Sequence, residues 1–292
     1  MKKRIEVDFK GYLDKKRKTV ERSLDSLLPS VKEKPATVHR AMRYSVFAGG
    51  KRLRPILAIA TFELLGKKGK MILAPACALE LIHTYSLIHD DLPCMDDDDL
   101  RRGKPTCHKV FGEGIAVLAG DALHALAFEL LTSTNRADVV MKVARAIGTK
   151  GMIGGQVADL EAEGKSKITL PEVRYIHNNK TGALVRASVM VGALIADASP
   201  EKLSALSEFG KNIGLAFQIT DDLLDVTGEE RFVGKKTHKD QLKATYPKVI
   251  GVERSKRTAK KLIQQAKGHL GIFRRDETIL EKLADFVIDR SF

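Results

Sequence analysis

Apolar side chains recur every three or four residues along almost the whole chain, which is the spacing of one face of an α-helix. Alternating apolar and polar positions, the mark of a half-buried strand, are nearly absent, and the breaks fall at proline and glycine. This pattern predicts ten helices and no good strand. The helices are expected at residues 5–28, 35–48, 53–66, 71–91, 113–132, 136–162, 170–196, 201–227, 245–269 and 276–290.

Several predicted helices are apolar around most of their circumference, for example "IAVLAGDALHALAFELL" and "RASVMVGALIADA". Such helices have neighbours on several sides, as in the interior of a large bundle. The chain of 292 residues is long enough for one large domain or two smaller ones. Because no change of composition and no Pro/Gly/Ser-rich linker divides it, we expect a single all-α domain over residues 1–292.

The longest uncharged apolar stretches, "MILAPACAL" and "ASVMVGALIA", are about half as long as a membrane-spanning helix. The basic N-terminus lacks the apolar segment of a signal peptide, and its acidic residues argue against a transit peptide. The three cysteines show no CxxC spacing, which favours reduced thiols over disulfides or zinc ligands. We therefore expect a cytoplasmic protein without stable membrane insertion.

The net charge of +13 favours an anionic partner, which could be nucleic acid, an anionic membrane surface or an anionic small molecule. The basic residues are spread along the chain, without interleaved aromatic residues or a nucleic-acid-binding motif. This distribution disfavours nucleic acid.

The first of two aspartate clusters lies in "HDDLPCMDDDDLRRGKPTCH". Asp90 and Asp91 end a predicted apolar helix, Pro93 breaks that helix, and Asp96 can turn back over the same opening. Hard oxygen ligands without His or Cys favour Mg²⁺ or Ca²⁺. The few carboxylates per site leave room for waters and phosphate oxygens, which indicates Mg²⁺.

The second cluster, "QITDDLLD", places Asp221 and Asp225 one helical turn apart on one face, with Asp222 beside them. The flanking side chains are apolar, and carboxylates among buried residues need a cation or shifted pKa values. Basic residues stand in "GGKRLRP", "RRGK", "HNNKTG" and "VGKK", and Arg and Lys bind phosphate oxygens. The combination predicts a site for diphosphate groups, in which the acids hold Mg²⁺ and the bases meet the phosphates.

These motifs closely resemble those of the short-chain trans-isoprenyl diphosphate synthases, and in particular of the bacterial farnesyl diphosphate synthases. The resemblance runs in the family's order through most of the chain. It includes "GGKRLRP", "LIHTYSLIHDDLPCMDDDDLRRGKPTCH", "GEGIAVLAGDAL", "GGQVADLEAEG", "HNNKTGALVRASV", "GLAFQITDDLLDVTG", "VGKK", "KATYPKVIG" and "LADFVIDR".

The resemblance implies the isoprenoid synthase fold, a bundle of about ten helices around a deep central apolar cavity, and a homodimer. It implies Mg²⁺-dependent, head-to-tail condensation of isopentenyl diphosphate with dimethylallyl and geranyl diphosphate, giving (2E,6E)-farnesyl diphosphate. A geranylgeranyl diphosphate synthase remains the first alternative. A non-catalytic partner subunit remains a second, although such subunits usually lose aspartates from one cluster and both clusters are intact here.

Carried over motif by motif, the resemblance implies three Mg²⁺ ions held by Asp90, Asp91, Asp96, Asp221, Asp222 and Asp225. The residues expected to bind isopentenyl diphosphate are Lys51, Arg54, His83 and Arg102. Those expected to face the allylic diphosphate or the developing cation are Arg101, Lys180, Thr181, Gln218 and Lys235. Gln156 and Asp159 match a family element for which a supporting role and a purely structural role are both open.

Product length is expected to depend on Tyr85, which lies about 7–8 Å deeper than Asp90 along the predicted helix, on nearly the same face. The resemblance implies that a bulky aromatic residue there forms the floor of the cavity and stops elongation at the C15 product. Two departures from the family pattern follow "VGKK": His238 stands where a glycine is expected, and the loop before "KATYP" is short. They leave the arrangement around Lys235 and Lys243 open.

Overall fold

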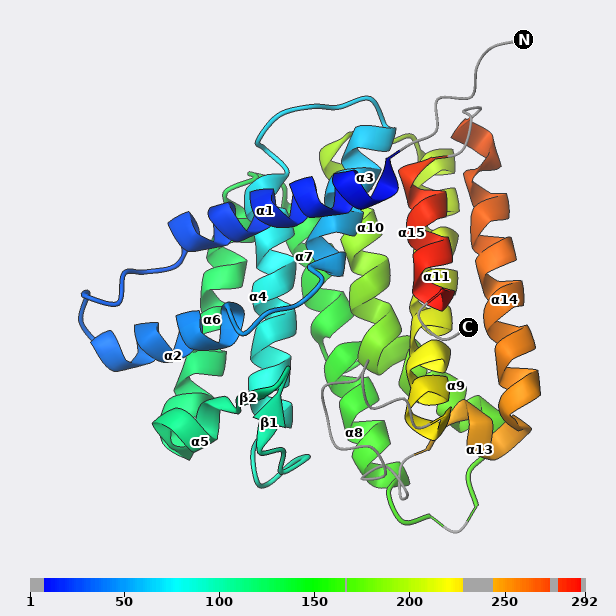
Figure 1. Cartoon of the computed structure of the whole chain (residues 1–292). Helices are drawn as coiled ribbons and strands as arrows, with labels where there is room; N and C mark the ends of the chain where they lie inside the picture. Colours follow the sequence, from blue (N-terminus) through cyan, green and yellow to red (C-terminus); the bar gives the residue numbers. More distant parts are fainter. Residues whose placement is uncertain (1–7, 166, 228–243, 274–277, 290–292) are drawn as a thin grey trace. The chain divides into compact units, whose positions relative to one another are not determined.

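The structure is a computed structural model that describes residues 8–165, 167–227, 244–273 and 278–289. These residues are mainly helical, and their only strands are a two-residue antiparallel pair, β1 (Leu100–Arg101) and β2 (Lys104–Pro105) (Figure 1). The prediction of an all-α fold is confirmed.

The α-helices of the described residues are α1 (Phe9–Leu27), α2 (Ala36–Val46), α3 (Leu53–Leu64), α4 (Leu73–Asp90), α5 (Cys107–Phe111), α6 (Glu113–Thr132), α7 (Ala137–Ile147), α8 (Met152–Ala162), α9 (Leu170–His177), α10 (Ala183–Ile195), α11 (Pro200–Thr227), α13 (Tyr246–Ile250), α14 (Val252–His269) and α15 (Ile279–Ile288). A π-helix (Asn178–Gly182) joins α9 to α10, and a 3₁₀ helix (Leu270–Phe273) follows α14.

Two predicted helices are broken where the sequence pattern runs on. The segment 136–162 is divided between α7 and α8, and a side chain at Gly151 would overlap the carbonyl group of Ala146. The segment 245–269 is divided at Gly251, whose φ of +81° interrupts the helix. The prediction also missed α5 and the pair β1–β2.

The chain forms two compact units of interleaved segments, and α1, α3 and α7 have residues in both. One unit contains residues 12–56 and 69–137; here α4 packs against α6 and α2, and α4 is buried along most of its length. The other contains residues 1–11, 57–68 and 138–292; here the long helix α11 packs against α10 on one side and α14 on the other (Figure 1). The single-domain interpretation stays a prediction.

Helix α6 is long and apolar enough, by length and composition alone, to cross a membrane, with a mean hydropathy of 1.6. Among the described residues it is the only helix that meets this test, and its sequence predicts a helix in the interior of a bundle. Core helices of soluble proteins meet the same test, and α6 packs within its own unit against α2, α4 and α5. The observation is therefore weak evidence for a membrane span.

Candidate active site

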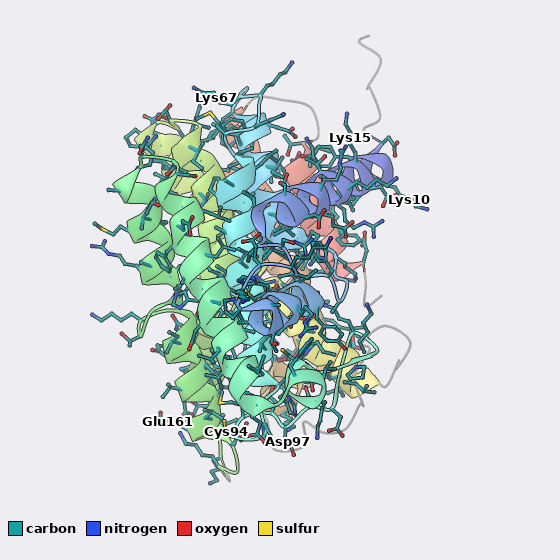
Figure 2. The ribbon with its side chains drawn as sticks, turned by 90° about the vertical axis from the view of Figure 1, so that its left-hand side faces the viewer. Lys10, Lys15, Lys67, Cys94, Asp97 and Glu161 are labelled. Atoms are coloured by element: carbon teal, nitrogen blue, oxygen red, sulfur yellow. The ribbon has the colours of Figure 1, made fainter. Side chains whose placement is uncertain are left out.

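The first aspartate cluster begins at the C-terminal end of α4 and continues into a loop that folds back over it. The backbone N–H of Asp96 donates to the carbonyl oxygen of Asp90 at 2.8 Å, and that of Asp98 donates to the carbonyl oxygen of Asp91 at 3.3 Å. The expectation that Asp96 turns back over the helix end is confirmed. The exposed side chains of Cys94 and Asp97 lie toward the outer part of this loop (Figure 2).

Asp91 is buried, with 3% of its surface exposed, and its carboxylate is bound by Arg101. The Nε of Arg101 donates to Oδ1 of Asp91 at 2.8 Å, and Nη2 bonds the same oxygen and also Oδ2 of Asp98 at 3.2 Å. Burial lowers the pKa of Arg101, and the hydrogen bond and charge of Asp91 more than offset this, so that the pKa is raised. Arg101 is therefore a fixed cation.

Asp90 and Asp96 differ from Asp91 because their side chains are half-exposed. Two carboxylates on adjacent backbone segments are a donor set that fits Mg²⁺, which takes one or two carboxylates and completes its shell with waters or phosphate oxygens. Within the described residues, no three His, Cys, Asp or Glu side chains gather closely enough to hold a metal by themselves. The roles of Asp90, Asp91 and Asp96 as metal ligands stay predictions.

The segment "GGKRLRP" is shaped by a buried ion pair. Arg52 has a positive φ of +53° and donates from Nη1 to Oε1 of Glu80 on α4 at 2.8 Å, and from Nη2 to the carbonyl oxygen of Val46 at 2.8 Å. Both side chains of the pair are at most 2% exposed. The pair therefore fixes the backbone that carries Lys51 and Arg54, two of the residues expected to bind isopentenyl diphosphate.

Arg102 and His83 lie close to this segment. The guanidinium of Arg102 donates to the carbonyl oxygen of Gly49 and passes so close to Gly50 that a Cβ there would overlap it. Burial lowers the pKa of His83, and the charges of Arg54 and Arg102 lower it further, so the imidazole is neutral at pH 7. The structure thus brings His83, Arg54 and Arg102 into one electrostatic group.

A small pocket lies in the same unit, between α2, α4 and the segment that follows the aspartate loop. Asp91, Arg101 and Arg102 line it together with apolar and small polar side chains such as Leu87 and Thr106. Tyr44 closes one side by donating a hydrogen bond to the carbonyl oxygen of Pro105 at 2.7 Å. Charged residues of the candidate site therefore border a small concave surface.

The second aspartate cluster lies at the C-terminal end of α11, in the other unit. Asp221 and Asp225 are half-exposed. Asp222 is buried, with 3% of its surface exposed. Its carboxylate is contacted by His177 Nε2 at 2.7 Å, and it accepts hydrogen bonds from the backbone N–H of Tyr246 at 2.9 Å and from Gln218 Nε2 at 3.3 Å. The roles of these three aspartates as metal ligands also stay predictions.

The π-helix between α9 and α10 carries Lys180 and Thr181, and π-helical turns are frequent at functional sites. Lys180 Nζ donates to Oδ2 of Asp159 at 2.6 Å, and Thr181 Oγ1 donates to Oε1 of Gln218 at 2.7 Å. The glycine of "GGQ" next to Gln156, Gly155, packs so tightly on the backbone of Lys180 that a side chain there would overlap it. Asp159 thus supports Lys180. Lys235, His238 and Lys243 lie outside the described residues.

Tyr85 is 7% exposed and lies in an aromatic stack. Its ring is nearly parallel to that of His124 on α6, with centroids 4.7 Å apart and an interplanar angle of 21°. His89 meets it edge-on at 5.8 Å. Burial raises the pKa of Tyr85 to about 12, and the charge of Asp90 adds to this shift. Five residues rotate a helix by about 140°, so the prediction that Tyr85 and Asp90 share nearly one face is wrong, and Tyr85 is turned toward α6.

Residues 35–278 match the family model described as polyprenyl synthetase. The chain belongs to the polyprenyl synthetase family. It is 47% identical to geranylgeranyl pyrophosphate synthase 4 of Arabidopsis thaliana, over 97% of this chain and 78% of that protein.

Two solved structures extend the comparison. A crystal structure of an FPP/GFPP synthase from Zymomonas mobilis matches with a TM-score of 0.86 and 38% identity, over 96% of this chain and 99% of that one. A geranyltransferase from Helicobacter pylori, complexed with magnesium and isoprenyl diphosphate, matches with a TM-score of 0.83 and 30% identity, over 98% of both chains. The predicted resemblance to short-chain trans-prenyl diphosphate synthases is confirmed, and this polyprenyl synthetase is a prenyltransferase with the isoprenoid synthase fold.

Sequence reasoning about this synthetase missed three side chains that shape the candidate site. Glu80 is a lone charge in the apolar run "ACALELIHTYS". A charge in such a run indicates a buried partner of opposite charge. His177 is the first residue of "HNNKTG". Only Lys180 and Thr181 of that motif were predicted to act on the substrate. His124 gave no signal, because its contact with Tyr85 depends on how α4 and α6 pack.

Proposed function

We propose that this prenyltransferase joins isopentenyl diphosphate head to tail to dimethylallyl diphosphate and then to geranyl diphosphate, and releases (2E,6E)-farnesyl diphosphate. The observation that carries the C15 product is the place of Tyr85. Tyr85 lies about 7–8 Å from Asp90 along the axis of α4. Its ring is on the side of the helix that faces α6, where His124 packs flat against it and holds it in place. An aromatic ring held there limits the length of a hydrocarbon chain that grows from a diphosphate bound near Asp90.

In this proposal, Asp90, Asp96, Asp221 and Asp225 hold Mg²⁺, while Asp91 and Asp222 act as internal acceptors for Arg101 and for His177. Bound Mg²⁺ would neutralise the charge of the departing allylic diphosphate. This set is smaller than the six aspartates predicted from the sequence, because only these four carboxylates are half-exposed.

The basic residues bind and orient the two diphosphates. Arg101, held by Asp91, presents its free guanidinium edge to phosphate oxygens, and Lys51, Arg54 and Arg102 bind the diphosphate of isopentenyl diphosphate. The neutral His83 donates a hydrogen bond without adding charge.

Lys180, Thr181 and Gln218 lie beside the allylic substrate in the proposed complex. The ammonium of Lys180 faces the diphosphate, and the side-chain oxygens of Thr181 and Gln218 face the allylic cation as it forms. The contacts Lys180–Asp159 and Thr181–Gln218 orient these side chains before the substrate binds. The apolar walls of the expected central cavity exclude water from the reacting carbons. The released diphosphate takes the proton that the product loses.

The enzyme acts as a homodimer in which a second copy covers the exposed apolar side of α5 and α6. The support for this part is that Val110, Val117 and Leu118 are 39–56% exposed on these two helices. Sedimentation at several protein concentrations tests this part. Wild type should sediment as a dimer and Leu118→Glu as a monomer, and a monomeric wild type would contradict the proposal.

A C20 product is the second candidate, because relatives that are 44–47% identical to this chain are named geranylgeranyl pyrophosphate synthases. The deciding experiment incubates the purified protein with Mg²⁺, isopentenyl diphosphate and dimethylallyl diphosphate, and measures product lengths by mass spectrometry. We expect farnesyl diphosphate. A C20 main product would replace the C15 assignment and keep the chemistry, whereas no product from folded protein would favour the partner-subunit alternative.

Two variants of the acidic run provide the control. Asp90→Ala removes a proposed ligand and should abolish product formation. Asp99→Asn removes an exposed carboxylate of the same run, which pairs with Lys109 at 2.8 Å. Exposed pairs contribute little, so Asp99→Asn should keep wild-type activity. Equal loss in both variants would show that the run acts through its total charge and not through Asp90.

A further inference from the structure

His177 and Asp222 form a buried pair for which the proposed function has no reaction step. His177 is the last residue of α9, three residues before Lys180, and Asp222 stands between Asp221 and Asp225 on α11. Their side chains are 5% and 4% exposed. Burying a carboxylate is costly unless its oxygens are hydrogen-bonded. The burial of Asp222 therefore depends on its hydrogen-bond partners.

Both oxygens of Asp222 are occupied by groups of the chain. Oδ2 lies 2.7 Å from His177 Nε2 and accepts from the backbone N–H of Tyr246 at 2.9 Å, and Oδ1 accepts from Gln218 Nε2 at 3.3 Å. The ring of Tyr246 lies 5.4 Å from that of His177, between centroids. Asp222 therefore joins α9, α11 and the first residue of α13.

The tautomer of His177 follows from its surroundings. Nδ1 is buried and has no hydrogen-bond partner among the described residues. A neutral ring carries one N–H, and only Nε2 faces an acceptor, so the proton belongs on Nε2 and is donated to Asp222. His177 thus acts as a directed donor from a fixed ring.

Gln218 links Asp222 to Thr181, which lies on the same chain segment as His177. Gln218 donates from Nε2 to Asp222 and accepts at Oε1 from Thr181 Oγ1 at 2.7 Å, so its amide has one orientation. His177 and Thr181 are four residues apart, and so are Gln218 and Asp222. Three hydrogen bonds thus connect four side chains in the order His177, Asp222, Gln218 and Thr181, and the equal spacings let the two helical segments meet at both ends of this chain of contacts.

We propose that His177 is a positioning residue: through Asp222 and Gln218 it sets the orientation of Thr181 and the rotation of the end of α11. That rotation decides where Asp221 and Asp225 point. The inference rests on the proposed roles of Thr181, Asp221 and Asp225 toward the allylic diphosphate and Mg²⁺. It predicts that loss of the His177 donor weakens binding at the Mg²⁺–diphosphate site, although His177 itself does not contact the metal or the diphosphate.

The test compares three variants of the full chain. His177→Leu removes the donor and keeps an apolar side chain of moderate size, whereas His177→Gln keeps an N–H donor near the place of Nε2. Val173→Ala removes methyl groups from a fully buried position one turn earlier on α9 and breaks no hydrogen bond. It serves as the control for a purely structural loss.

Two readouts separate positioning from stability. The first is calorimetric binding of inorganic diphosphate in the presence of Mg²⁺, and the second is the KM of each substrate. For His177→Leu we expect diphosphate affinity to fall and the allylic KM to rise by about tenfold or more, since small misplacements of reacting groups are costly. The KM of isopentenyl diphosphate should stay within about twofold, and His177→Gln should recover most of both losses.

The inference is wrong if His177→Leu and Val173→Ala, compared at the same fraction folded, change diphosphate affinity and allylic KM alike. It is also wrong if His177→Gln is as impaired as His177→Leu. Should His177→Leu fail to fold, His177→Asn takes its place, because its amide is shorter and falls away from Asp222. A wild type that makes no product would overturn the proposed function, while the binding series would still decide on His177.

Discussion

Replacing Tyr85 by alanine tests the C15 product most directly. The ring is 7% exposed and stacked on His124, so its loss opens a space between α4 and α6 below Asp90. Because alanine leaves this space unfilled, we expect the chain to grow by one more isoprene unit. Geranylgeranyl diphosphate should then become the main product.

The stability cost of this change can be estimated from the contacts. Truncating a large buried aromatic side chain costs about 3–5 kcal/mol. The hydroxyl of Tyr85, however, is buried without a hydrogen-bond partner among the described residues, and removing such a group returns about 1–3 kcal/mol. The net loss is then about 2 kcal/mol, which most single domains survive.

The matched control is Tyr85→Phe, which keeps the ring and removes the orphaned hydroxyl. It should still make the C15 product, and its free energy of unfolding should rise by about 1 kcal/mol. The assay is product length by mass spectrometry, with unfolding by urea in parallel. Unchanged C15 output from Tyr85→Ala would refute the reasoning, and so would C20 output from Tyr85→Phe.

Three further changes test neighbouring parts of the site. His124→Ala removes the stacking partner and should release a mixture of C15 and C20 products, whereas His124→Phe should keep C15; identical products from both would show that the stack has no effect. Glu80→Gln removes the buried counter-charge of Arg52 and leaves only the part-exposed Glu21 at 3.8 Å, so it should lower the free energy of unfolding by about 3 kcal/mol in urea titrations; a loss below about 1 kcal/mol would contradict a buried pair. The pKa of His83 is lowered below its unfolded value of about 6.5. Below pH 6.5 the unfolded chain therefore binds a proton at His83 that the folded chain does not. The stability contribution of His83 is lost as the pH falls through this range. Wild type should therefore lose more stability between pH 7.5 and pH 5.5 than His83→Gln, and equal losses would contradict the shift.

The sequence predicted helix type and order well, because the apolar spacing of a buried helix is local information. It predicted boundaries less well where a local signal was overlooked. The helix expected from 276 begins at Ile279, because Thr278 and Glu281 form a capping box that is legible as T-x-x-E. The break between α7 and α8 is a second case, because "GTKGMIGG" places four glycines within eight residues at this point of the chain.

The contacts within the candidate site were predictable only in part. That Asp96 returns to the end of α4 followed from Pro93, because proline ends a helix locally. The pair Arg52–Glu80 did not follow, since it requires a positive φ at Arg52 and a partner 28 residues away. The stack of Tyr85 on His124 depends in the same way on the packing of two helices.

One regularity was present in the spacing of both aspartate clusters. Successive residues on a helix point about 100° apart, whereas residues four apart point about 40° apart. Asp221 and Asp225 can therefore face one ion together. Asp222 points about 100° away from Asp221 and is engaged by His177 and Tyr246, and Asp91 likewise turns away from Asp90. Buried Asp91 and Asp222 indeed accept hydrogen bonds from within the chain. In each cluster, the second of two adjacent aspartates is thus placed to hold the protein scaffold, which leaves the half-exposed carboxylates to bind Mg²⁺ in the proposed reaction.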